Sequence, residues 1–480
     1  AWFTDTASTA VNKIQAGNLD IELAYKNSTT GGEFKKADKS TPVFDNNALW
    51  EPGHVEYVVL KVSNAGNLAL KYKLGINIAS ETGSTNVLGN EFKLSDYIKF
   101  GVADEDLSGK TRDEMVAAVT DSKLINEGYS KENNLNKTND ADIVTLVVWM
   151  PKSVGNEANY KVAEGITAPS IDLGINVVAT QDTVENDSFD NTYDQDAEYP
   201  ILVTTGDELQ AIVSNATAPV NIVLTNSITT NNFVIPEDKD VTLDLNGRTV
   251  TNAGSHTILN KGHLTLTDSS ADKSGQIISL KGNTAALRNG DNAVCVVEGG
   301  TISRDGANGN TWHVVENFGK MTFNGGKVVL KNGNGFAITN GWNYFDPGAS
   351  TTHAVMEINA LKLDTDSSGI KNCRYGDLTV NDVTVNSTGY WALSNDYLGT
   401  AVINGGTLTS KSFKAVSNGA AMTVNGGTFD GTQGGLFVQS YATSTVLNGG
   451  TYTNMNVDAL SGYVGKGHTA QQNGISVIIK

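Results

Sequence analysis

The chain has 480 residues, and its 34 Lys and Arg against 52 Asp and Glu give a formal net charge of −18. A chain this acidic repels phosphate backbones, so nucleic acid is excluded as an expected partner. With 39% hydrophobic and 18% charged residues, the composition indicates a globular protein of two or three domains rather than a disordered one.

Two cysteines, Cys295 and Cys373, are too few for a disulfide framework or a Cys-based zinc site, and we expect two free thiols. The six histidines are scattered and form no H-E-x-x-H motif, so we expect no bound metal at them. No apolar run approaches the roughly 20 residues of a membrane-spanning helix. The first residues, AWFTDT, lack an initiator Met and are typical of a mature N-terminus after removal of a signal peptide.

Residues 1–181 are predicted to form a β-rich domain. Segment 54–64 is rich in β-branched and aromatic residues, and segment 68–78 alternates apolar with polar residues, as a half-buried strand does. One short helix is expected to begin at Thr111, which forms a capping box with Glu114. The remaining pattern favours a β-sandwich of about seven strands.

The segment 182–199 changes composition sharply, and we predict that it is an acidic linker between two domains. Its carboxylates are Asp182, Glu185, Asp187, Asp190, Asp194, Asp196 and Glu198. Carboxylate oxygens suit calcium, which is the alternative interpretation of this run. Because the D-x-[DN]-x-[DN]-G spacing of a calcium loop is absent, we favour the solvated linker and expect no cofactor.

Residues 200–480 carry an internal repeat. Its mark is a Gly pair inside a Thr-rich, apolar run, and a Gly pair in a strand indicates a sharp bend. The residue before the bend is Asn or Glu, at Asn246, Glu298, Asn324, Asn359, Asn381, Asn404, Asn425 and Asn448. The last four steps of this series are 22, 23, 21 and 23 residues.

A second column of asparagines falls earlier in each repeat. Its members are Asn260, Asn289, Asn317, Asn340, Asn395 and Asn418. Each repeat therefore has a strand, an Asn turn, a strand, a Gly bend and a strand, which predicts a right-handed parallel β-helix with stacked asparagines over 200–480. A helix beginning near Thr205 is expected to close the first coil, and a strand within 474–480 the last.

The stretches AWFTDTAS, IQAGNLDIEL, LWEPGHVEYVVLKVSNAGNLALKYKL and VVWMPKSVGNEANY, with APSIDLGINVVATQ, cover nearly all of residues 1–182. On these stretches the first domain resembles the TasA/camelysin family of secreted, biofilm-matrix-type proteins. The resemblance implies a jelly-roll-like β-sandwich, export by a signal peptide that a dedicated peptidase removes, and fibre formation. Some relatives were called metallopeptidases, but we expect His54, beside Glu56, to be a surface strand residue and do not transfer that role.

The stretches VTTGDELQAIV, KDVTLDLNGRTV and YVGKGHTAQQNGISVII resemble the pectate-lyase-like β-helix modules of Gram-positive surface proteins. That class holds both adhesins and enzymes, so the fold alone decides nothing. The favoured hypothesis is a secreted structural or adhesive protein of the cell surface or matrix that displays its β-helix. The alternative is a polysaccharide lyase or glycoside hydrolase acting on a β-helix face.

Catalysis on a polysaccharide would need paired carboxylates, or a base with a cation. The candidates are Asp346, Asp364, Asp366, Lys371, Arg374 and Asp396. Asp364 and Asp366 would point to the same side of a strand, although their segment also fits a turn. Because nothing locates a cation that faces both carboxylates, we expect no enzymatic activity.

Aromatic residues are the candidates for carbohydrate binding. Counting on from the Asn column places Trp342, Tyr375 and Tyr397 two residues later, so coil stacking would gather them on one outer edge. Tyr344 and Trp391 lie nearby in sequence and complete the candidate set. Exposed aromatic clusters often mark binding surfaces, and flat rings suit sugars; the other interpretation is that these rings merely cover the coils.

The N-terminal residues Ala1, Trp2, Phe3, Thr4 and Asp5 are the candidate assembly site. Such a segment can add as a strand to the next subunit's sheet, and of Trp2 and Phe3 at least one would face the neighbour's core. A head-to-tail contact of this kind does not close, so it predicts a filamentous homopolymer. The alternative is that the segment pairs within its own sandwich and protects an edge.

Overall fold

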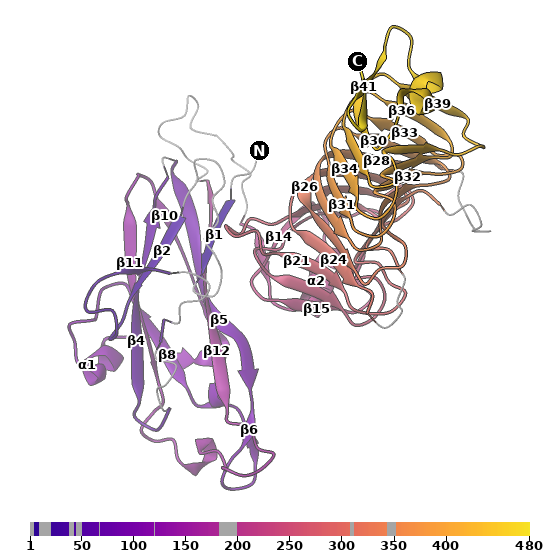
Figure 1. Cartoon of the computed structure of the whole chain (residues 1–480). Coiled ribbons are helices and arrows are strands. Elements are labelled where there is room, and N and C mark those ends of the chain that lie inside the picture. The colour runs from indigo at the N-terminus through magenta and orange to yellow at the C-terminus, as the bar shows by residue number, and fades with distance from the viewer. Residues whose placement is uncertain are drawn as a thin grey trace. The chain divides into compact units, whose positions relative to one another are not determined.

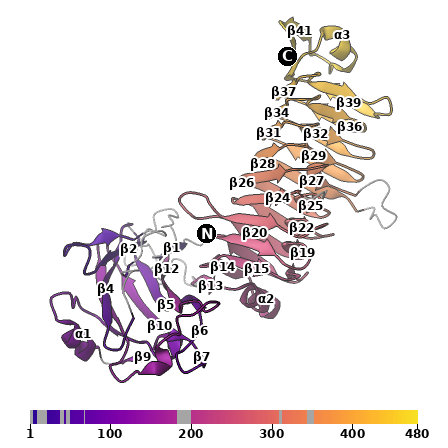
Figure 2. The same cartoon turned by 60° about the horizontal axis from the view of Figure 1, so that its bottom comes forward.

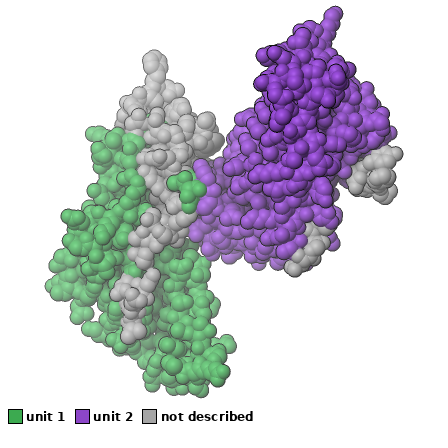
Figure 3. Space-filling model, viewed as in Figure 1, with its two compact units in different colours: residues 1–200, 269–272 green, residues 201–268, 273–480 purple. Residues whose placement is uncertain are grey.

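A computed structural model of the chain describes residues 4–8, 21–37, 43–44, 50–66, 68–119, 121–181, 199–307, 312–342 and 352–480. The fold contains 8% helix and 50% strand, which confirms the predicted all-β class. Two compact units can be separated (Figure 3): Ala1–Pro200 with Ser269–Asp272, and Ile201–Asp268 with Lys273–Lys480.

The first unit is built on two antiparallel sheets (Figure 1). One sheet has the order β1 (Thr4–Ser8), β12 (Ser170–Gln181), β5 (Leu70–Thr82), β10 (Tyr129–Leu135). The other has the order β3 (Lys35–Lys36), β2 (Ile21–Lys26), β4 (Val55–Asn64), β11 (Ala141–Trp149), β8 (Lys99–Ala103), β9 (Lys123–Leu124), and a hairpin joins β6 (Ser84–Thr85) to β7 (Glu91–Phe92).

Apolar side chains of both sheets share one core, in which Ile21 and Leu60 of the six-stranded sheet pack with Leu74 and Ile175 of the other. This arrangement agrees with a β-sandwich, while the jelly-roll connectivity stays a prediction.

The helix α1 (Arg112–Ala118) explains why β4 is apolar on both faces. Met115 of α1 packs in a second cluster with Tyr57 of β4 and Trp149 of β11, on the side away from the main core. The helix begins as predicted, since the Thr111 hydroxyl accepts from the Glu114 amide and the Glu114 carboxylate accepts from the Thr111 amide.

The second unit is a parallel β-helix of about ten coils over residues 201–452, which confirms the prediction for this region. Its largest sheet contains β13 (Ile201–Val203), β14 (Val220–Leu224), β15 (Ile228–Thr230), β17 (Asp240–Asp244), β18 (Thr249–Asn252), β20 (His263–Thr267), β21 (Gln276–Ser279), β23 (Val294–Val297), β24 (Thr301–Asp305), β26 (Lys320–Lys331), β28 (Ala354–Thr365), β30 (Gly376–Val380), β31 (Thr384–Ser387), β33 (Thr400–Ile403), β34 (Thr407–Ser410), β36 (Ala421–Val424), β37 (Thr428–Gly431), β39 (Ser444–Leu447), β40 (Gly450–Thr453), β41 (Ala470–Asn473) and β42 (Ser476–Ile479).

A nine-stranded parallel sheet forms the remaining side of the coils, and Figure 2 shows its strands following one another along the helix. It contains β16 (Val234–Ile235), β19 (Ile258–Asn260), β22 (Leu287–Asn289), β25 (Val315–Asn317), β27 (Phe336–Asn340), β29 (Ser368–Asn372), β32 (Leu393–Asn395), β35 (Val416–Asn418) and β38 (Leu436–Val438). One complete coil is thus β30, β31 and β32, which pair in parallel with β33, β34 and β35 of the next coil.

The Gly pairs form the bends between strands. A Cβ on Gly405 would lie 2.7 Å from the Asn381 carbonyl oxygen of the preceding coil, so no side chain fits there. Gly406 has a φ of +99°, a conformation that L-residues with a Cβ rarely adopt. The two glycines therefore meet different demands, one for close approach of two coils and one for backbone direction.

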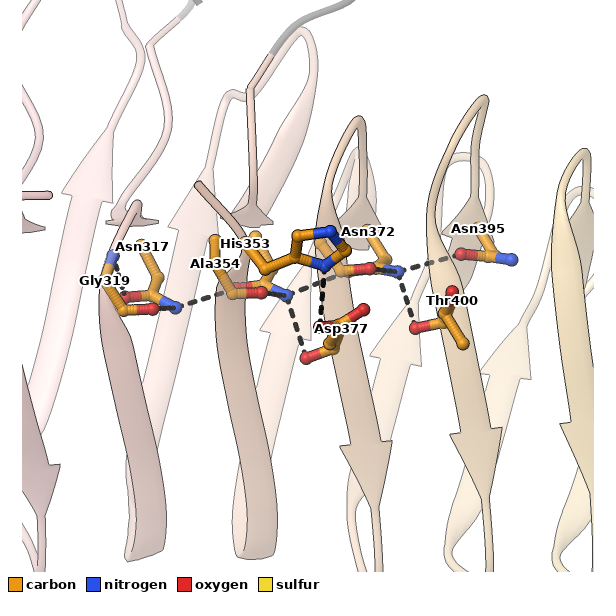
Figure 4. A network of polar contacts seen from close by, with 10 residues as sticks. Asn317, Gly319, His353, Ala354, Asn372, Asp377, Asn395 and Thr400 are labelled. Atoms are coloured by element: carbon orange, nitrogen blue, oxygen red, sulfur yellow. Dashed lines mark hydrogen bonds and ion pairs between the residues drawn. The ribbon is translucent and has the colours of Figure 1, made fainter. Parts of the chain in front are cut away.

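The six predicted asparagines of the inner column are stacked, and a seventh, Asn372, joins them (Figure 4). At each step the Nδ2 of one residue donates to the Oδ1 of the next coil's residue, at 2.7–2.9 Å. All members are fully buried: Asn260, Asn289, Asn317, Asn340, Asn372, Asn395 and Asn418. We call this row the inner ladder.

A second row of amides runs along the Gly bends, and we call it the outer ladder. It contains Glu298, Asn324, Asn359, Asn381, Asn404, Asn425 and Asn448, all exposed or half-buried. Each Asn donates its Nδ2 to the residue of the preceding coil at 2.7–3.0 Å, so the row ends on the Glu298 carboxylate. The first residue of the predicted series, Asn246, is buried instead, and its Nδ2 donates to the Leu224 carbonyl.

Both ends of the coil stack are closed. The helix α2 (Gly206–Asn215) begins at Thr205, whose hydroxyl accepts from the Glu208 amide, and it contacts β15 and β16 with Leu209 and Val213 buried. At the other end β42 pairs antiparallel with β40 and β41, which stops the parallel ladder, and the short α3 (Val457–Leu460) follows the last coil. None of the helices in the described parts of the chain is long and apolar enough to cross a membrane.

Candidate functional site

The exposed aromatic side chains of the described residues are concentrated on one part of the β-helix. They are Tyr390, Tyr397, Phe437 and Tyr441, with exposed fractions of 60%, 44%, 37% and 55%. All four belong to the coils of β32 and β38, which lie on either side of β35 in the nine-stranded sheet. We call the outward side of β29, β32, β35 and β38, with its flanking residues, the C-terminal face.

The floor of the C-terminal face is one column of outward side chains. Strand register places Lys371, Ser394, Ser417 and Phe437 one after another, each directly above its neighbour in the adjacent coil. The amide Nε2 of Gln439 donates to the Ser417 hydroxyl at 3.1 Å. The floor thus changes from an ammonium group through two hydroxyls to an aromatic ring.

Aromatic rings from three coils form the border where the strands begin. Trp391 lies edge-on to Phe413 at a centroid distance of 4.7 Å and 6.2 Å from Phe437. Tyr390 contacts Phe413 at 6.0 Å, and the ammonium of Lys414 lies 3.8 Å from the Phe437 centroid. These rings stabilise one another, and the cation over Phe437 fixes that ring's position.

Polar and aromatic residues form the opposite border, where the strands end. The Lys371 ammonium and the Asp396 carboxylate are 3.5 Å apart, and both side chains are partly exposed. Tyr441 covers Gly419, because a Cβ there would lie 2.7 Å from the tyrosine ring. Burial, with the nearby Asp396 carboxylate, raises the pKa of Tyr441, so its phenol remains a hydrogen-bond donor at neutral pH.

The C-terminal face therefore combines two aromatic borders with a polar floor. Hydroxyls, an amide and an ion pair can exchange hydrogen bonds with the hydroxyls of a sugar, while the rings offer apolar contact to its C–H faces. Of the predicted candidates, Trp391 and Tyr397 lie here. Sequence reasoning did not find Phe413, Lys414, Phe437 or Gln439, although the repeat length of about 22 residues relates Trp391 to Phe413.

Trp342 lies in a different group of residues, four coils upstream of β38. Its ring packs against Phe318 at 4.4 Å, the Arg288 guanidinium lies 4.7 Å from the Phe318 centroid, and Arg288 is paired with Glu316 at 3.0 Å. Burial raises the pKa of Glu316, while Arg288 acts in the opposite direction. Tyr344, the neighbouring candidate, lies outside the described residues.

Tyr375 does not follow the Asn column by two residues. The inner ladder includes Asn372, so Tyr375 comes three residues later, where it has a φ of +59°. Its ring lies 5.7 Å from that of His353, whose Nδ1 is 2.8 Å from an Asp377 carboxylate oxygen (Figure 4). Tyr375 therefore belongs to a small cluster with His353 and Asp377.

The candidate catalytic carboxylates are engaged separately. Asp364 is paired with Lys327 at 2.8 Å and accepts from Asn386, and these partners hold the pKa of Asp364 below its usual range against the effect of burial. Asp366 instead accepts from the backbone amides of Asn332 and Gly333, which is a turn-capping role.

The remaining catalytic candidates are dispersed as well. The guanidinium of Arg374 lies 5.1 Å from the Tyr375 ring, and Lys371 with Asp396 belongs to the C-terminal face. Asp346 is outside the described residues. The described residues thus offer one candidate pair on an aromatic surface, Lys371 with Asp396.

The N-terminal candidates are only partly described. Ala1, Trp2 and Phe3 lie outside the described residues, whereas Thr4 and Asp5 begin β1. This strand pairs antiparallel with β12 of the same chain, from Thr4 opposite Thr180 to Ser8 opposite Asn176. In the single chain, β1 thus occupies the edge of the four-stranded sheet, which is the pairing within its own sandwich that we considered above.

No cluster of three or more metal-ligating side chains occurs within the described ranges, and the acidic segment 182–198 lies outside them. His54 contacts only one carboxylate, with its Nε2 3.0 Å from Glu56. Cys295 and Cys373 are free and buried as predicted, and burial raises the pKa of each thiol to about 12. Neither cysteine is therefore a reactive thiolate at neutral pH.

Comparison with known proteins found no matching family model, curated protein or solved structure.

Proposed function

We propose that this chain is a secreted structural and adhesive protein. Its first unit assembles head to tail through the N-terminal strand, and its β-helix presents the C-terminal face to a carbohydrate of the cell surface or matrix. The observation that supports the binding role is the gathering of all described exposed aromatic residues around the floor column of Lys371, Ser394 and Ser417.

The assembly proposal is supported by the position of β1. It is a five-residue edge strand that meets only β12, through main-chain pairing from Thr4 to Ser8. An edge strand of this kind can be replaced by the same strand from a neighbour without loss of main-chain hydrogen bonds. Each exchange leaves one end of the pair free, so repeated exchange produces filaments.

Electron microscopy of the full chain and of a chain lacking residues 1–10 tests the assembly. We expect filaments only from the full chain, and we expect a peptide of residues 1–10 added in excess to shorten them. Filaments of unchanged form from the truncated chain would contradict the exchange, as would a full chain that stays monomeric at high concentration.

Binding of the full chain to a panel of soluble and insoluble polysaccharides tests the carbohydrate proposal. Trp391→Ala should weaken binding by at least about tenfold, because it removes the ring that contacts both Phe413 and Phe437. Trp342→Ala is the matched control, since Trp342 lies in the upstream group and should leave affinity unchanged. Equal losses in both variants, or no binding by the parent chain, would reject this role for the C-terminal face.

We place the Lys371–Asp396 pair in binding rather than catalysis. Lys371→Ala should then reduce retention on the bound polysaccharide, and no new reducing or unsaturated ends should form with the parent chain. If such ends do form and Lys371→Ala or Asp396→Asn abolishes them, the chain is an enzyme and the alternative hypothesis holds.

A further inference from the structure

Arg304 is the most deeply buried charged side chain of the described residues, with an exposed fraction of 1%. It lies on β24 and faces inward, because burial alternates along Thr301–Asp305 and places Ile302 and Arg304 inside. Strand register sets it between Ser279 of the preceding coil and Leu330 of the following coil. A full positive charge thus lies inside the β-helix.

Neutral groups alone surround one end of the guanidinium. Nη1 donates to the Ser279 hydroxyl at 2.9 Å and to the carbonyl oxygens of Lys281 and Thr284 at 3.3 and 2.5 Å. No carboxylate of the described residues pairs with Arg304. Burial lowers the pKa of Arg304, but a guanidinium does not lose its proton in proteins, so the charge persists.

The other edge of the guanidinium is the unusual feature. Nε and Nη2 are both buried and have no hydrogen-bond partner among the described residues. A buried donor without an acceptor costs free energy, and an uncompensated buried charge costs several kcal/mol more. The Nε–Nη2 edge is also the fork with which arginine binds anions through two parallel hydrogen bonds.

The fold itself does not require a charge at this position. The same inward column continues as Leu330, Thr365, Ser387 and Ser410 in the following coils, all of them uncharged. An apolar or hydroxyl side chain therefore satisfies the packing of this corner. Arginine at 304 indicates a further partner that supplies the missing negative charge.

We propose that the Nε–Nη2 fork of Arg304 binds a small monovalent anion of the halide class, enclosed in this corner of the β-helix. The anion compensates the guanidinium charge and accepts the two unpaired N–H groups. Because Arg304 is fully buried and its only fixed acceptors are neutral, the site selects for a small and weakly hydrated ion. Binding of this anion stabilises the folded β-helix in proportion to its occupancy.

Thermal unfolding of the full chain at constant ionic strength tests this proposal. We expect the midpoint of the β-helix transition to rise saturably when sodium chloride or bromide replaces sodium gluconate. Arg304→Met should abolish this anion dependence. Lys281→Met is the matched control, because it removes a positive charge near the same corner while the main-chain carbonyl that accepts from Arg304 remains. An identical dependence in Arg304→Met, or none in the parent chain, would overturn the proposal.

Crystals of the parent chain grown in sodium bromide give a second readout that does not depend on folding of the variant. An anomalous peak within hydrogen-bond distance of both Nε and Nη2 is the expected result. Density of a water molecule without anomalous signal at this position would show that the fork is hydrated and that no anion site exists.

Discussion

The inner and outer ladders use the same residue and the same hydrogen bond, yet they lie in opposite environments. Steps of the inner ladder measure 2.7–2.9 Å between fully buried carboxamides, and steps of the outer ladder measure 2.7–3.0 Å between carboxamides that water reaches. Distance therefore does not separate the two rows. What separates them is the alternative that each amide has when its partner is removed.

An amide of the inner ladder has no alternative. Asn317 shows how fully its groups are used: Nδ2 donates to the Asn340 Oδ1 and to the Val355 carbonyl, and Oδ1 accepts from the Gly319 amide. An amide of the outer ladder can turn to water. The same interaction should thus contribute much more to stability inside than outside, because an unmade buried hydrogen bond costs the full desolvation of both groups.

The largest effect is expected from breaking the inner ladder at its middle. Asn340→Ala leaves the Asn317 donor and the Asn372 acceptor without their partners and should lower the free energy of unfolding by about 2–5 kcal/mol. Urea unfolding of the β-helix transition measures this. A cost below about 1 kcal/mol would show that water or repacking replaces the lost bonds, and the contrast between the ladders would then be wrong.

A smaller effect is expected at the bends that carry the outer ladder. Gly406→Ala adds a Cβ 2.7 Å from the Val383 carbonyl oxygen at a φ of +99°, so it should cost about 1–3 kcal/mol. Gly462→Ala is the control, since nothing lies within 4 Å of a Cβ there and its φ is not positive. If both variants unfold at the same urea concentration, the backbone of the bend does not limit stability.

The sequence predicts the ladders well because their period is local and their chemistry is specific. Six members of the inner ladder and the outer series from Glu298 to Asn448 follow from the spacing of Asn and Gly. Asn372 was missed because Cys373, and not Gly, follows it, although Ile370 precedes it in the pattern of Ile338 and Asn340.

The C-terminal face was harder to predict for a physical reason. Outward side chains on a β-helix meet their neighbours one coil away, so a contact depends on the exact insertion length between coils. Lys414 and Phe437 are 23 residues apart, yet they are in contact only because the register of β35 and β38 aligns them. Trp342 and Tyr397 share a sequence position relative to the column but lie in different surface clusters.

A titratable contact between coils extends the contrast to pH. His256 Nδ1 accepts from the Ala285 amide at 2.9 Å, and burial, with Arg288 nearby, lowers the pKa of His256 to about 4. Because the folded-state pKa lies below the unfolded value of about 6.5, the unfolded chain binds more protons between these values. Stability of the β-helix should therefore be full above about pH 6.5 and fall as the pH decreases toward 4.

Unfolding midpoints of the parent chain and of His256→Gln across this pH range measure the effect. The decrease should be shallower in His256→Gln, and His263→Gln, at an exposed ring, is the control. Because His256 is only partly buried, we expect an effect smaller than that of the bend. Parallel pH profiles for all three chains would exclude His256 as the group responsible.

The smallest effect is expected from the outer ladder itself. Asn404→Ala removes the donor to Asn381 and the acceptor for Asn425, which are the counterparts of the groups lost in Asn340→Ala. Because water can take both places, the cost should be about 0.5–1 kcal/mol, which is the net value of an ordinary hydrogen bond. Asn404→Asp separates the two contacts, since the carboxylate still accepts from Asn425 but cannot donate to Asn381. Asn404→Asp should therefore cost no less than Asn404→Ala at low salt, and added salt should reduce the part of this cost that comes from the new charge. If Asn404→Ala destabilises the β-helix as strongly as Asn340→Ala, the outer row is shielded from water in solution, and a surface bound over the Gly bends must supply that shielding.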